Sequence, residues 1–439
     1  MTEADFETDS AAQRRRERIV VMILAAVQFT TIVDFMIVMP LGPQLMRALH
    51  IGPAQFGLIV SSYTFAAGAA GLVASSIIDR FARRNTFMIL YAGFLLGTLL
   101  CALAPNYHLL VFARVATGAF GGILGGMAMT IIGDVFPEHR RGRATGSLMT
   151  GFALASVAGV PFGLFLGTNY GWHIPFIALV LGGIPALVLT PFALPPLNAH
   201  VGKSHAHPLR SLVETFSHAN HLNAFALIIS LMIGSFTVFP YVSAYLVANV
   251  GMTEQQLPLI YIFGGGLTLL AAPIIGRLAD RYGKLTVFRV VAPISALLMA
   301  AITQLPRVPV AVAVVVFGAL MVSNVGRMIA AMAIITSSVE PHRRGGFLSA
   351  NASVQHVACG VAAYLGGLII KESVDGRIEH FNIVGWIAAA ATLSSLWLAG
   401  RVRLAEQTYT SAEKLSLAAA AEATADAGEP MLNAAEEGC

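Results

Sequence analysis

The stretch IVVMILAAVQFTTIVDFMIVM, Ile19 to Met39, decides the fold, and Pro40 closes it. Its 21 residues are enough to cross a bilayer core of about 30 Å as a helix. Of the 23 acidic residues in the chain, Asp34 alone lies deep inside an apolar run. A carboxylate in lipid is costly and normally faces a partner or a wet cavity. Asp34 is therefore the first candidate functional residue.

The composition is that of a polytopic membrane protein. Of 439 residues, 56% are hydrophobic and 11% are charged, whereas a soluble domain carries roughly 25% charge. The net charge of +4 does not indicate nucleic-acid binding, because the basic residues stand in short clusters between apolar runs. Cys101 and Cys359 lie in apolar runs and Cys439 is the last residue, so no disulfide framework is predicted. The first run lacks a small-residue cleavage site, so we expect it to remain as a helix.

Apolar runs long enough to span a bilayer recur twelve times. They lie at about 19–46, 56–78, 86–104, 108–133, 144–168, 172–193, 222–248, 256–275, 286–304, 309–335, 346–370 and 381–400. The runs fall into two groups of six, which predict an N-terminal bundle at 18–193 and a C-terminal bundle at 222–403.

Three polar segments flank or join the predicted bundles. Residues 1–17 are polar and mixed in charge, and 404–439 are rich in Ala and Glu, so both are predicted to be disordered tails. Residues 194–221 contain Pro195-Pro196 and five histidines and form the predicted linker.

The distribution of Lys and Arg predicts the orientation in the membrane. Nineteen of these residues fall at one end of the apolar runs, beginning with Arg14–Arg16 and including the clusters near Arg83 and Arg140. Four fall at the other end, namely Arg47, Arg307, Lys371 and Arg377. Basic residues gather on the cytoplasmic side, so both termini and the linker are predicted to be cytoplasmic.

The two halves repeat in sequence. Met39-Pro40 corresponds to Phe239-Pro240 at an offset of 200. SSIIDRFARR at 75–84 corresponds to GRLADRYGKL at 276–285, and AMTIIGDVFPEHRRG at 128–142 corresponds to AMAIITSSVEPHRRG at 331–345. Two repeated six-helix bundles place a substrate site near the midplane between them.

These motifs resemble those of the major facilitator superfamily, over residues 18–403. SSIIDRFARR and GRLADRYGK are similar to the family's loop signature and its copy, although Ser75 and Ala82 stand where glycines are usual. RVATG at 114–118 resembles the helix 4 motif of proton-driven members, and AGVPFG at 158–163 resembles the antiporter signature of helix 5. TIVDFMIVMPLGP around Asp34 resembles the helix 1 motif of twelve-helix drug:proton antiporters. GVPFG followed by GW at 171–172, and NASVQH in helix 11, are most similar to the sugar- or arabinose-efflux-like bacterial branch.

Asp34 and Arg114 form the predicted proton-coupling pair. Asp34 lies about 15 residues into helix 1, roughly 23 Å from the cytoplasmic end at 1.5 Å per residue. Arg114 lies about six residues into helix 4 from the outside, so both are predicted at comparable depth. Burial favours the protonated carboxyl and a nearby guanidinium favours the carboxylate, so their relative movement can drive proton uptake or release. The alternative is a static ion pair that fixes the two helices.

A second polar group is predicted near the midplane of the C-terminal half. Arg327 lies about nine residues, and His356 about ten, from the cytoplasmic ends of their spans. Their polar neighbours on adjoining turns are Ser323, Asn324, Asn351 and Gln355. The interior then holds two positive charges, on Arg114 and Arg327, and one negative charge, on Asp34, a net charge of +1 before histidines are counted. This balance favours a neutral, zwitterionic or anionic substrate. The alternative is a purely structural Arg327 held by amides and backbone carbonyls.

A charged cluster is predicted at the cytoplasmic face, formed by Asp79, Arg83 and Asp134, with Asp280 as the counterpart in the repeat. Asp134 ends helix 4 within reach of Arg83, and Asp79 could face the N-terminus of helix 11. The family resemblance implies that this cluster latches the two bundles in the outward-open state. The alternative is that these charges only set the topology.

Helix 5 and several large side chains complete the candidate site. Gly159, Pro161 and Gly163 permit close helix contact and a local bend, since proline removes a backbone donor. This packing could seal the proton path. The side chains that could line an apolar cavity are Phe35, Met36, Phe236, Phe239, Tyr241 and Tyr261. Ordinary packing is the alternative for each of them.

No cofactor, metal or catalytic motif is predicted. The linker histidines, from His200 to His221, have no second type of metal ligand close by. The chain lacks a phosphate-binding Gly-rich loop with Lys-Ser/Thr, an HExxH motif and a nucleophile elbow. An ATP-driven pump and an integral-membrane enzyme are therefore disfavoured.

The sequence thus predicts a transporter, not an enzyme: a monomeric, proton-driven antiporter of the bacterial inner membrane. Its partners would be a small amphipathic molecule, protons and the lipid bilayer, without nucleic acid. The alternatives are a proton-coupled importer of a sugar or carboxylate and a non-transporting membrane sensor, for which no signalling domain is visible.

Overall fold

The computed structural model describes residues 3–78, 81–195, 215–340 and 344–403. Within them, twelve helical segments are long and apolar enough to cross a membrane. This number equals that of the apolar runs, and the predicted all-α membrane fold is confirmed.

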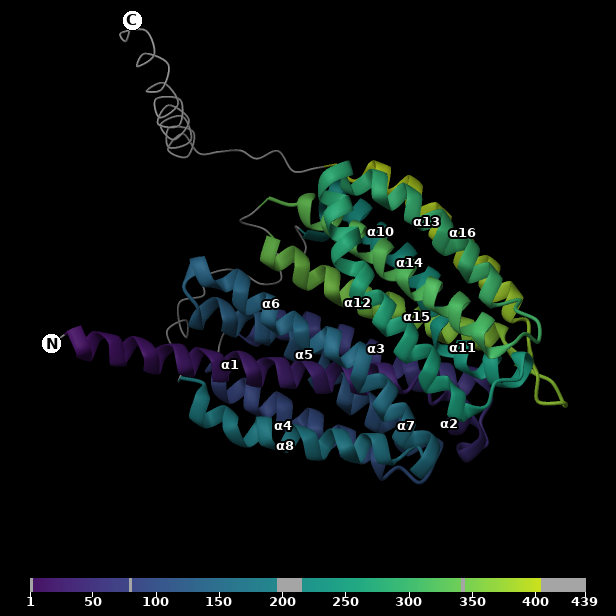
Figure 1. Cartoon of the computed structure of the whole chain (residues 1–439), viewed down its shortest axis with the longest axis horizontal. Coiled ribbons are helices and arrows are strands. Elements are labelled where there is room, and N and C mark those ends of the chain that lie inside the picture. The colour runs from purple at the N-terminus through teal and green to yellow at the C-terminus, as the bar shows by residue number, and fades with distance from the viewer. Residues whose placement is uncertain (1–2, 79–80, 196–214, 341–343, 404–439) are drawn as a thin grey trace, which may run out of the picture.

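The N-terminal group of helices lies in the lower part of Figure 1. It comprises α1 (Glu3–Ile37), α2 (Gly42–Leu49), α3 (Pro53–Ile77), α4 (Arg83–Ala102), α5 (Tyr107–Val135), α6 (Glu138–Leu154), the π-helical turn η2 (Ala155–Gly159), α7 (Val160–Tyr170) and α8 (Ile174–Ala193). Helix α6, turn η2 and helix α7 together make the fifth membrane span.

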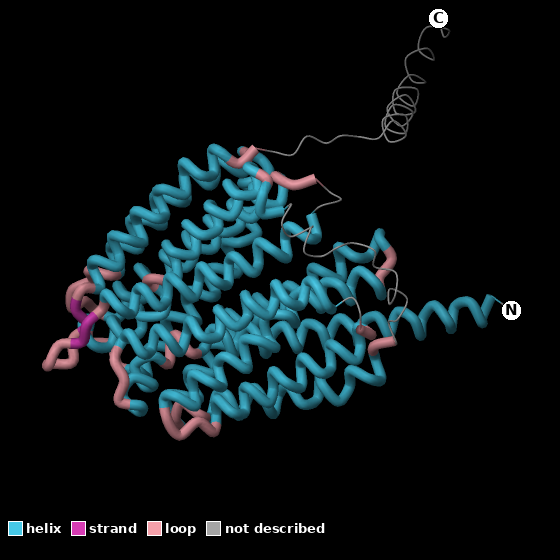
Figure 2. Tube along the Cα trace, turned by 180° about the vertical axis from the view of Figure 1, so that it is seen from behind, coloured by secondary structure: helices cyan, strands magenta, loops and turns pink. Residues whose placement is uncertain are grey.

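The C-terminal group lies in the upper part of the same view. It comprises α10 (Ala219–Phe236), α11 (Phe239–Tyr245), the π-helical turn η3 (Leu246–Val250), the short 3-10 helix η4 (Glu254–Gln256), α12 (Leu257–Tyr282), α13 (Lys284–Ile302), α14 (Val310–Ser337), α15 (Arg344–Ile369) and α16 (Phe381–Arg401). Strands β1 (Lys371–Glu372) and β2 (Ile378–Glu379) form a small antiparallel hairpin, with Lys371 opposite Glu379. Figure 2 shows this hairpin at the end of the molecule opposite the N-terminus.

The N-terminal segment differs from the predicted disordered tail, because α1 begins at Glu3. Alanine, glutamine and arginine are strong helix formers, and extending an existing helix costs far less than starting one. Two side chains of α1 at the start of its membrane-spanning part bond to other helices. Arg16 donates from Nε to the Ala193 carbonyl at 3.3 Å, and Glu17 pairs with Arg140 at 2.8 Å.

Two spans are broken at equivalent places in the repeat. Helix α1 ends at Ile37 and the chain resumes as α2 after Pro40. Helix α10 ends at Phe236 and resumes as α11 around Pro240. Proline cannot donate the backbone hydrogen bond that would continue either helix. The repeated proline therefore produces the same interruption in both groups.

Helices α3 and α15 join the two groups along an antiparallel seam of small residues. A Cβ atom placed on Gly57 would lie 2.9 Å from the Ala363 carbonyl oxygen, and one on Gly367 would lie 2.7 Å from that of Pro53. Small residues let helix backbones approach this closely within a membrane. The glycines of α3 and α15 therefore set the distance between the groups.

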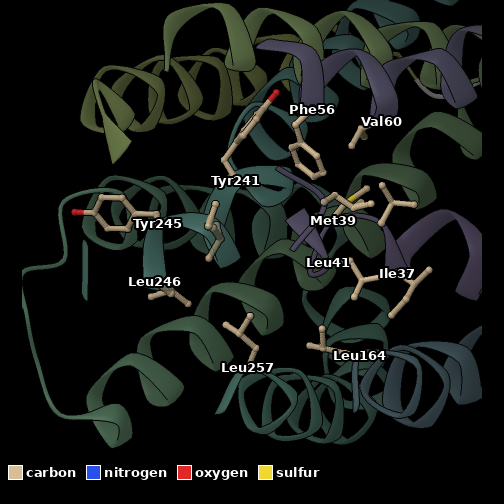
Figure 3. Close-up of a cluster of buried hydrophobic side chains, with 14 of the residues drawn as sticks. Ile37, Met39, Leu41, Phe56, Val60, Leu164, Tyr241, Tyr245, Leu246 and Leu257 are labelled. Atoms are coloured by element: carbon tan, nitrogen blue, oxygen red, sulfur yellow. The ribbon is translucent and has the colours of Figure 1, made fainter. Parts of the chain in front are cut away.

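Apolar side chains close the contact at the end opposite the N-terminus. Figure 3 shows Met39 and Leu41 in the segment before α2, Phe56 in α3, and Tyr241 in α11 within one buried cluster. The rings of Phe56 and Tyr241 meet edge to face at 5.9 Å between centroids. The two groups are thus tightly packed at this end.

Candidate functional site

Asp34 and Arg114 form a fully buried ion pair inside the N-terminal group. Arg114 Nη1 lies 2.7 Å from Asp34 Oδ2, and the two side chains are 1% and 0% exposed. Thr98 of α4 donates to the other carboxylate oxygen at 3.1 Å. Arg114 Nη1 also lies 3.4 Å from the Asp34 carbonyl oxygen. The carboxylate is therefore held by one charged and one neutral donor.

Glycines allow three helices to converge on Arg114. Gly97 of α4 faces Thr117 of α5, and a Cβ on Gly97 would lie 2.7 Å from the Thr117 hydroxyl. Gly118 of α5 packs against the backbone of Tyr63 in α3. The Tyr63 ring then covers the guanidinium, with Arg114 Cζ 4.4 Å from the ring centroid. Such a cation–π contact stabilises a charge that lacks water.

Arg114 does not use all of its hydrogen-bond donors. Its Nε is buried and has no hydrogen-bond partner within the described part of the chain. An unpaired buried donor is costly, so a rearrangement that supplied a second acceptor would be favoured. The Asp34–Arg114 pair thus has the chemistry of a switch as well as that of a structural contact.

The π-helical turn η2 shapes the wall beside Asp34. Pro161 stands at the start of α7 directly after η2 and cannot donate a backbone hydrogen bond. Gly159 packs directly against Val33, and a Cβ there would lie 3.0 Å from the Phe29 ring. A Cβ on Gly163 would likewise lie 3.0 Å from the Ile37 side chain. The glycines of the helix 5 motif therefore bring this span against the helix that carries Asp34.

Arg327 is the buried cation of the C-terminal group. It is 1% exposed and donates to Thr392 Oγ1 at 2.5 Å, Ser235 Oγ at 2.7 Å and Asn324 Oδ1 at 2.8 Å. No carboxylate of the described residues forms an ion pair with it. Three neutral oxygens from α10, α14 and α16 therefore hold a positive charge without a compensating negative one.

The predicted cavity-lining side chains divide into two sets. Tyr241 is fully buried and donates to the Ala363 carbonyl, and Tyr261 is bonded to Ser243 at 2.9 Å, so both lie in the packed cluster. Met36 and Phe236 are partly buried at its edge. Met36 lies 3.9 Å from the Ser156 hydroxyl, measured from its sulfur.

A cavity of about 160 Å³ lies between the two groups of helices. Its polar lining residues are Arg83, Thr130, Ser349, Ser353 and His356, and most of the rest are small or apolar, among them Ala67, Gly71, Gly122 and Gly126. His356 is thus the one residue predicted for the substrate cavity that lines it. Gln355, its neighbour in α15, is partly buried and is not among the lining residues.

The cavity ends close to the ion pair. Ala67 lines it and stands one helical turn from Tyr63, whose ring covers Arg114. The buried pair and the cavity between the groups are therefore neighbours along α3.

The cytoplasmic cluster is partly within the described residues. Arg83 forms an ion pair with Asp134, as the sequence predicted for these two side chains. Asp280 is exposed and forms no ion pair with the part of the chain that the structure describes. Asp79 lies outside the described residues, so its predicted contact with the N-terminus of α15 stays a prediction.

Among the linker histidines, His200, His205 and His207 also lie outside the described residues. His221 Nδ1 is 3.1 Å from the Thr215 carbonyl oxygen, and its ring packs against Phe347 at 4.8 Å. In the described ranges, no group of three or more His, Cys, Asp or Glu side chains is placed to bind a metal ion.

Sequence reasoning missed the neutral partners of the buried charges. Thr98, Ser235 and Thr392 are ordinary residues of apolar helices, and only the packing of different helices brings them to Asp34 or Arg327. It also missed an ion pair between the groups, Arg47 of α2 with Glu254 of η4. Glu254 lies four positions before Pro258 in a predicted outer loop, a weak signal that could have been tested against Arg47.

Twelve membrane helices in two repeated groups, with a cavity between the groups and a buried ion pair inside one of them, define a membrane transporter fold. The family described as "Major Facilitator Superfamily" matches residues 24–363 and 225–426. The chain belongs to this superfamily of transporters. One relative, the "Uncharacterized MFS-type transporter YtbD" of Bacillus subtilis (strain 168), is 23% identical over 367 residues, covering 83% of this chain and 90% of the relative.

Solved transporter structures share the fold. The xylose transporter XylE from E. coli, in a partially occluded inward-open conformation, aligns with a TM-score of 0.69 at 15% identity, over 90% of this chain and all (100%) of that chain. A D-xylose-proton symporter aligns with a TM-score of 0.72 at 14% identity, over 89% of this chain and 98% of that chain. A bacterial homologue of the human lysosomal transporter Spinster, in an inward-facing and unoccupied conformation, aligns with a TM-score of 0.66 at 14% identity, over 88% of this chain and 95% of that chain.

Proposed function

We propose that this protein is a proton-coupled antiporter that exports a small amphipathic molecule by alternating access. The observation that carries the proposal is the fully buried Asp34, paired with Arg114 at 2.7 Å beside the contact between the two groups of helices. An ionisable residue inside a membrane span is a functional candidate because its burial is expensive. The mixed donor set of Arg114 and Thr98 supports a carboxyl that can exchange its proton.

Protonation changes what the pair can do. The carboxylate attracts Arg114 and accepts from Thr98. A substrate that carries a hydrogen-bond donor can bind the Asp34 carboxylate only while that carboxylate has no proton. Protonation of Asp34 removes this acceptor and releases the substrate, and substrate binding on the other side of the membrane in turn requires loss of the proton. Proton and substrate thus compete for one carboxylate, which is the basis of exchange.

The charge balance of the interior selects the class of substrate. Arg114 and Arg327 against Asp34 leave one excess positive charge, and Arg327 has only neutral partners among the described residues. A permanent cation would add to this charge in a medium that screens it poorly. We therefore assign a neutral, zwitterionic or anionic amphipathic molecule to the transporter. Its proposed binding residues are Met36, Phe236, Asn324, Arg327, Gln355 and His356, together with Tyr241 and Tyr261 once the packed end of the interface separates.

The charged cluster and helix 5 have proposed conformational roles. Arg83 and Asp134, with Asp79 and Asp280, would latch the groups at the end that holds the N-terminus. Gly159, Pro161 and Gly163 would seal the proton path, a role supported by the close packing of the two glycines on α1. The bias of Lys and Arg supports cytoplasmic termini, and we place the protein as a monomer in the bacterial inner membrane without a cofactor.

The test is a substrate screen in membrane vesicles with a trapped pH-sensitive dye. We expect the exported compound to move protons in the opposite direction, and Asp34→Asn to abolish this exchange at an unchanged protein level. The matched control Asp375→Asn removes an exposed loop carboxylate and should behave as wild type. Asp34→Glu, which keeps an ionisable group, should retain part of the exchange. Wild-type coupling in Asp34→Asn would end the proposal.

The second candidate is a proton-coupled importer of a sugar or carboxylate. The observation in its favour is the fold shared with the xylose transporters, one of which is a proton symporter. The same vesicles separate the two functions. In an importer, an imposed proton gradient drives the substrate in the direction of the protons; in an antiporter, it drives the substrate against them.

A further inference from the structure

Three aromatic rings form a stack that crosses between the two groups of helices. Phe35 of α1 lies 5.3 Å from Tyr63 of α3 and 6.0 Å from Phe236 of α10, measured between ring centroids. The interplanar angles are 30° and 28°. Within the described residues, the only other aromatic contact between the groups is Phe56 with Tyr241. The stack is therefore one of two aromatic connections across this interface.

Each end of the stack is attached to a buried charge. Phe35 directly follows Asp34, and the Tyr63 ring covers the Arg114 guanidinium at 4.4 Å. At the other end, Phe236 directly follows Ser235, whose hydroxyl accepts from Arg327 at 2.7 Å. The buried networks of the two groups are thus joined through one pair of touching rings.

The contact lies beside an interruption in each of the two helices. Helix α1 ends at Ile37, two residues after Phe35, and α10 ends at Phe236 itself. Past each end the hydrogen bonding becomes irregular, because Met39 and Val238 bond three residues back, to Met36 and Ser235, and Pro40 and Pro240 have no N–H to donate. The rings of Phe35 and Phe236 are also only partly buried, whereas Asp34 and Arg327 are almost completely enclosed. A shift of one ring can therefore displace the other without opening the core.

We propose that Phe35 and Phe236 are positioning residues that transmit the protonation state of Asp34 to the C-terminal group. When Asp34 changes its bonding to Arg114, the end of α1 moves with Phe35. The contact with Phe236 makes the end of α10 follow, and this alters the support that Ser235 gives to Arg327. The inference rests on the proposed proton coupling and assigns its transmission to one contact.

The titratable side chains around Asp34 are few. Those that face it in the described residues are Arg114 from α5, Tyr63 from α3 and Cys101 from α4. His356 lies in the cavity and packs against Gly68 of α3, but it is still present in Asp34→Asn. Any pH response that Asp34→Asn removes can thus be separated from a response of His356.

The experiment follows the conformation of the full chain and needs no substrate. A reporter cysteine at Ala352, an exposed residue of the cavity wall, is introduced after Cys101, Cys359 and Cys439 have been replaced by alanine. The rate of its labelling by N-ethylmaleimide is measured in proteoliposomes across the acid to neutral range. Because maleimide reacts with the thiolate, whose fraction rises with pH, each rate is divided by that of free N-acetylcysteine at the same pH. We expect this normalised rate to change about threefold in the wild-type background as Asp34 titrates, and Asp34→Asn to abolish that change.

The aromatic variants decide the inference. Phe35→Leu and Phe236→Leu should each lose the pH dependence of the normalised labelling rate. Phe35→Tyr and Phe236→Tyr keep the stack and should retain it. The matched control Phe56→Leu removes the other aromatic contact between the groups and should also retain it.

The possible failures are distinguishable. If Asp34→Asn abolishes the pH response and both leucine variants preserve it, the role of the aromatic pair is overturned and the proton-coupled function stands. If the Phe56→Leu control loses the response as well, the effect belongs to interface packing and the inference is overturned. If the wild-type background shows no response that depends on Asp34, the proposed proton coupling itself fails.

Discussion

The buried arginine of the C-terminal group, Arg327, is a single residue whose charge can select the class of substrate. Arg327 is enclosed by α10, α14 and α16 and bonds only to neutral oxygens within the described residues. Burying an ionised group without a counter-charge is expensive, so such a residue persists where its charge has a use. The use that fits a transporter is to attract electron-rich substrates and to repel cations.

Replacing this charge should change substrate selection more than stability. We expect Arg327→Met to reduce transport of the native anionic or neutral substrate and to admit a permanent cation such as tetraphenylphosphonium, which the wild type should exclude. The three freed hydroxyl and amide groups can bond to one another, so the folding cost should stay at about 1–3 kcal/mol. Uptake of both compounds into vesicles measures the change. Arg289→Met, which removes an exposed arginine of α13, is the control.

A variant that remained closed to tetraphenylphosphonium would contradict this charge-selection argument. The same conclusion would follow if wild-type protein moved permanent cations well, because the excess positive charge would then have no effect on selection.

At the scale of the element, the fifth membrane span illustrates how packing and function share residues. The turn η2 precedes Pro161, and the glycines on the same face press against α1 next to Asp34. π-helical turns in α-helices are frequent at functional sites because they shift the register of one face. The irregular backbone is thus placed beside the carboxylate that it would seal from water.

Adding a methyl group to a glycine tests how closely the fifth membrane span packs against α1. We expect Gly159→Ala to destabilise the protein by about 1–3 kcal/mol through overpacking, since the new Cβ would meet Val33 and the Phe29 ring. Gly133→Ala is the matched control, because a Cβ there has no neighbour within 4 Å. This variant should be stabilised by about 1 kcal/mol, since alanine has a higher helix propensity than glycine. Thermal unfolding in detergent measures both. Equal unfolding temperatures for the two variants would show that the approach of η2 to α1 is not tight.

At the scale of the whole molecule, the two groups of helices are joined more firmly at one end. The cluster around Phe56 and Tyr241 closes the end opposite the N-terminus, whereas the cavity lies between α3, α5 and α15 and includes Arg83 in its wall. An ion pair between Arg47 and Glu254 spans the groups at the closed end. Alternating access requires this end to separate during each cycle.

Locking the closed end should therefore stop turnover. We expect the pair Arg47→Cys and Glu254→Cys, in a background without other cysteines, to lose transport when a bismaleimide with a reducible disulfide spacer joins the two thiols. Reduction with dithiothreitol should restore the activity. Surface ion pairs contribute only about 0–1 kcal/mol, so removal of the charges alone should leave the fold intact. Arg47→Cys by itself is the control, and full transport by the crosslinked double variant would exclude opening at this end.

Much of the fold could be predicted because the bilayer imposes local rules. A membrane span must be apolar over its own length and must satisfy its backbone internally, so twelve spans can be counted without knowledge of their neighbours. The repeated Pro40 and Pro240 likewise predict related halves, and both mark helix breaks in the structure. The N-terminal segment escaped the prediction, since its helix extends an apolar span into polar sequence.

The sequence by itself determined the number of spans, their repeat, and the isolation of Asp34 among the acidic residues. Only the tertiary structure decided which neutral side chains hold Asp34 and Arg327, that Tyr241 is packed and His356 faces the cavity, and that Phe35 meets Phe236. The physical reason is the range of the interactions. Hydropathy acts on each segment alone, whereas hydrogen bonds and ring contacts between helices depend on the rotation and depth of each helix in the bundle.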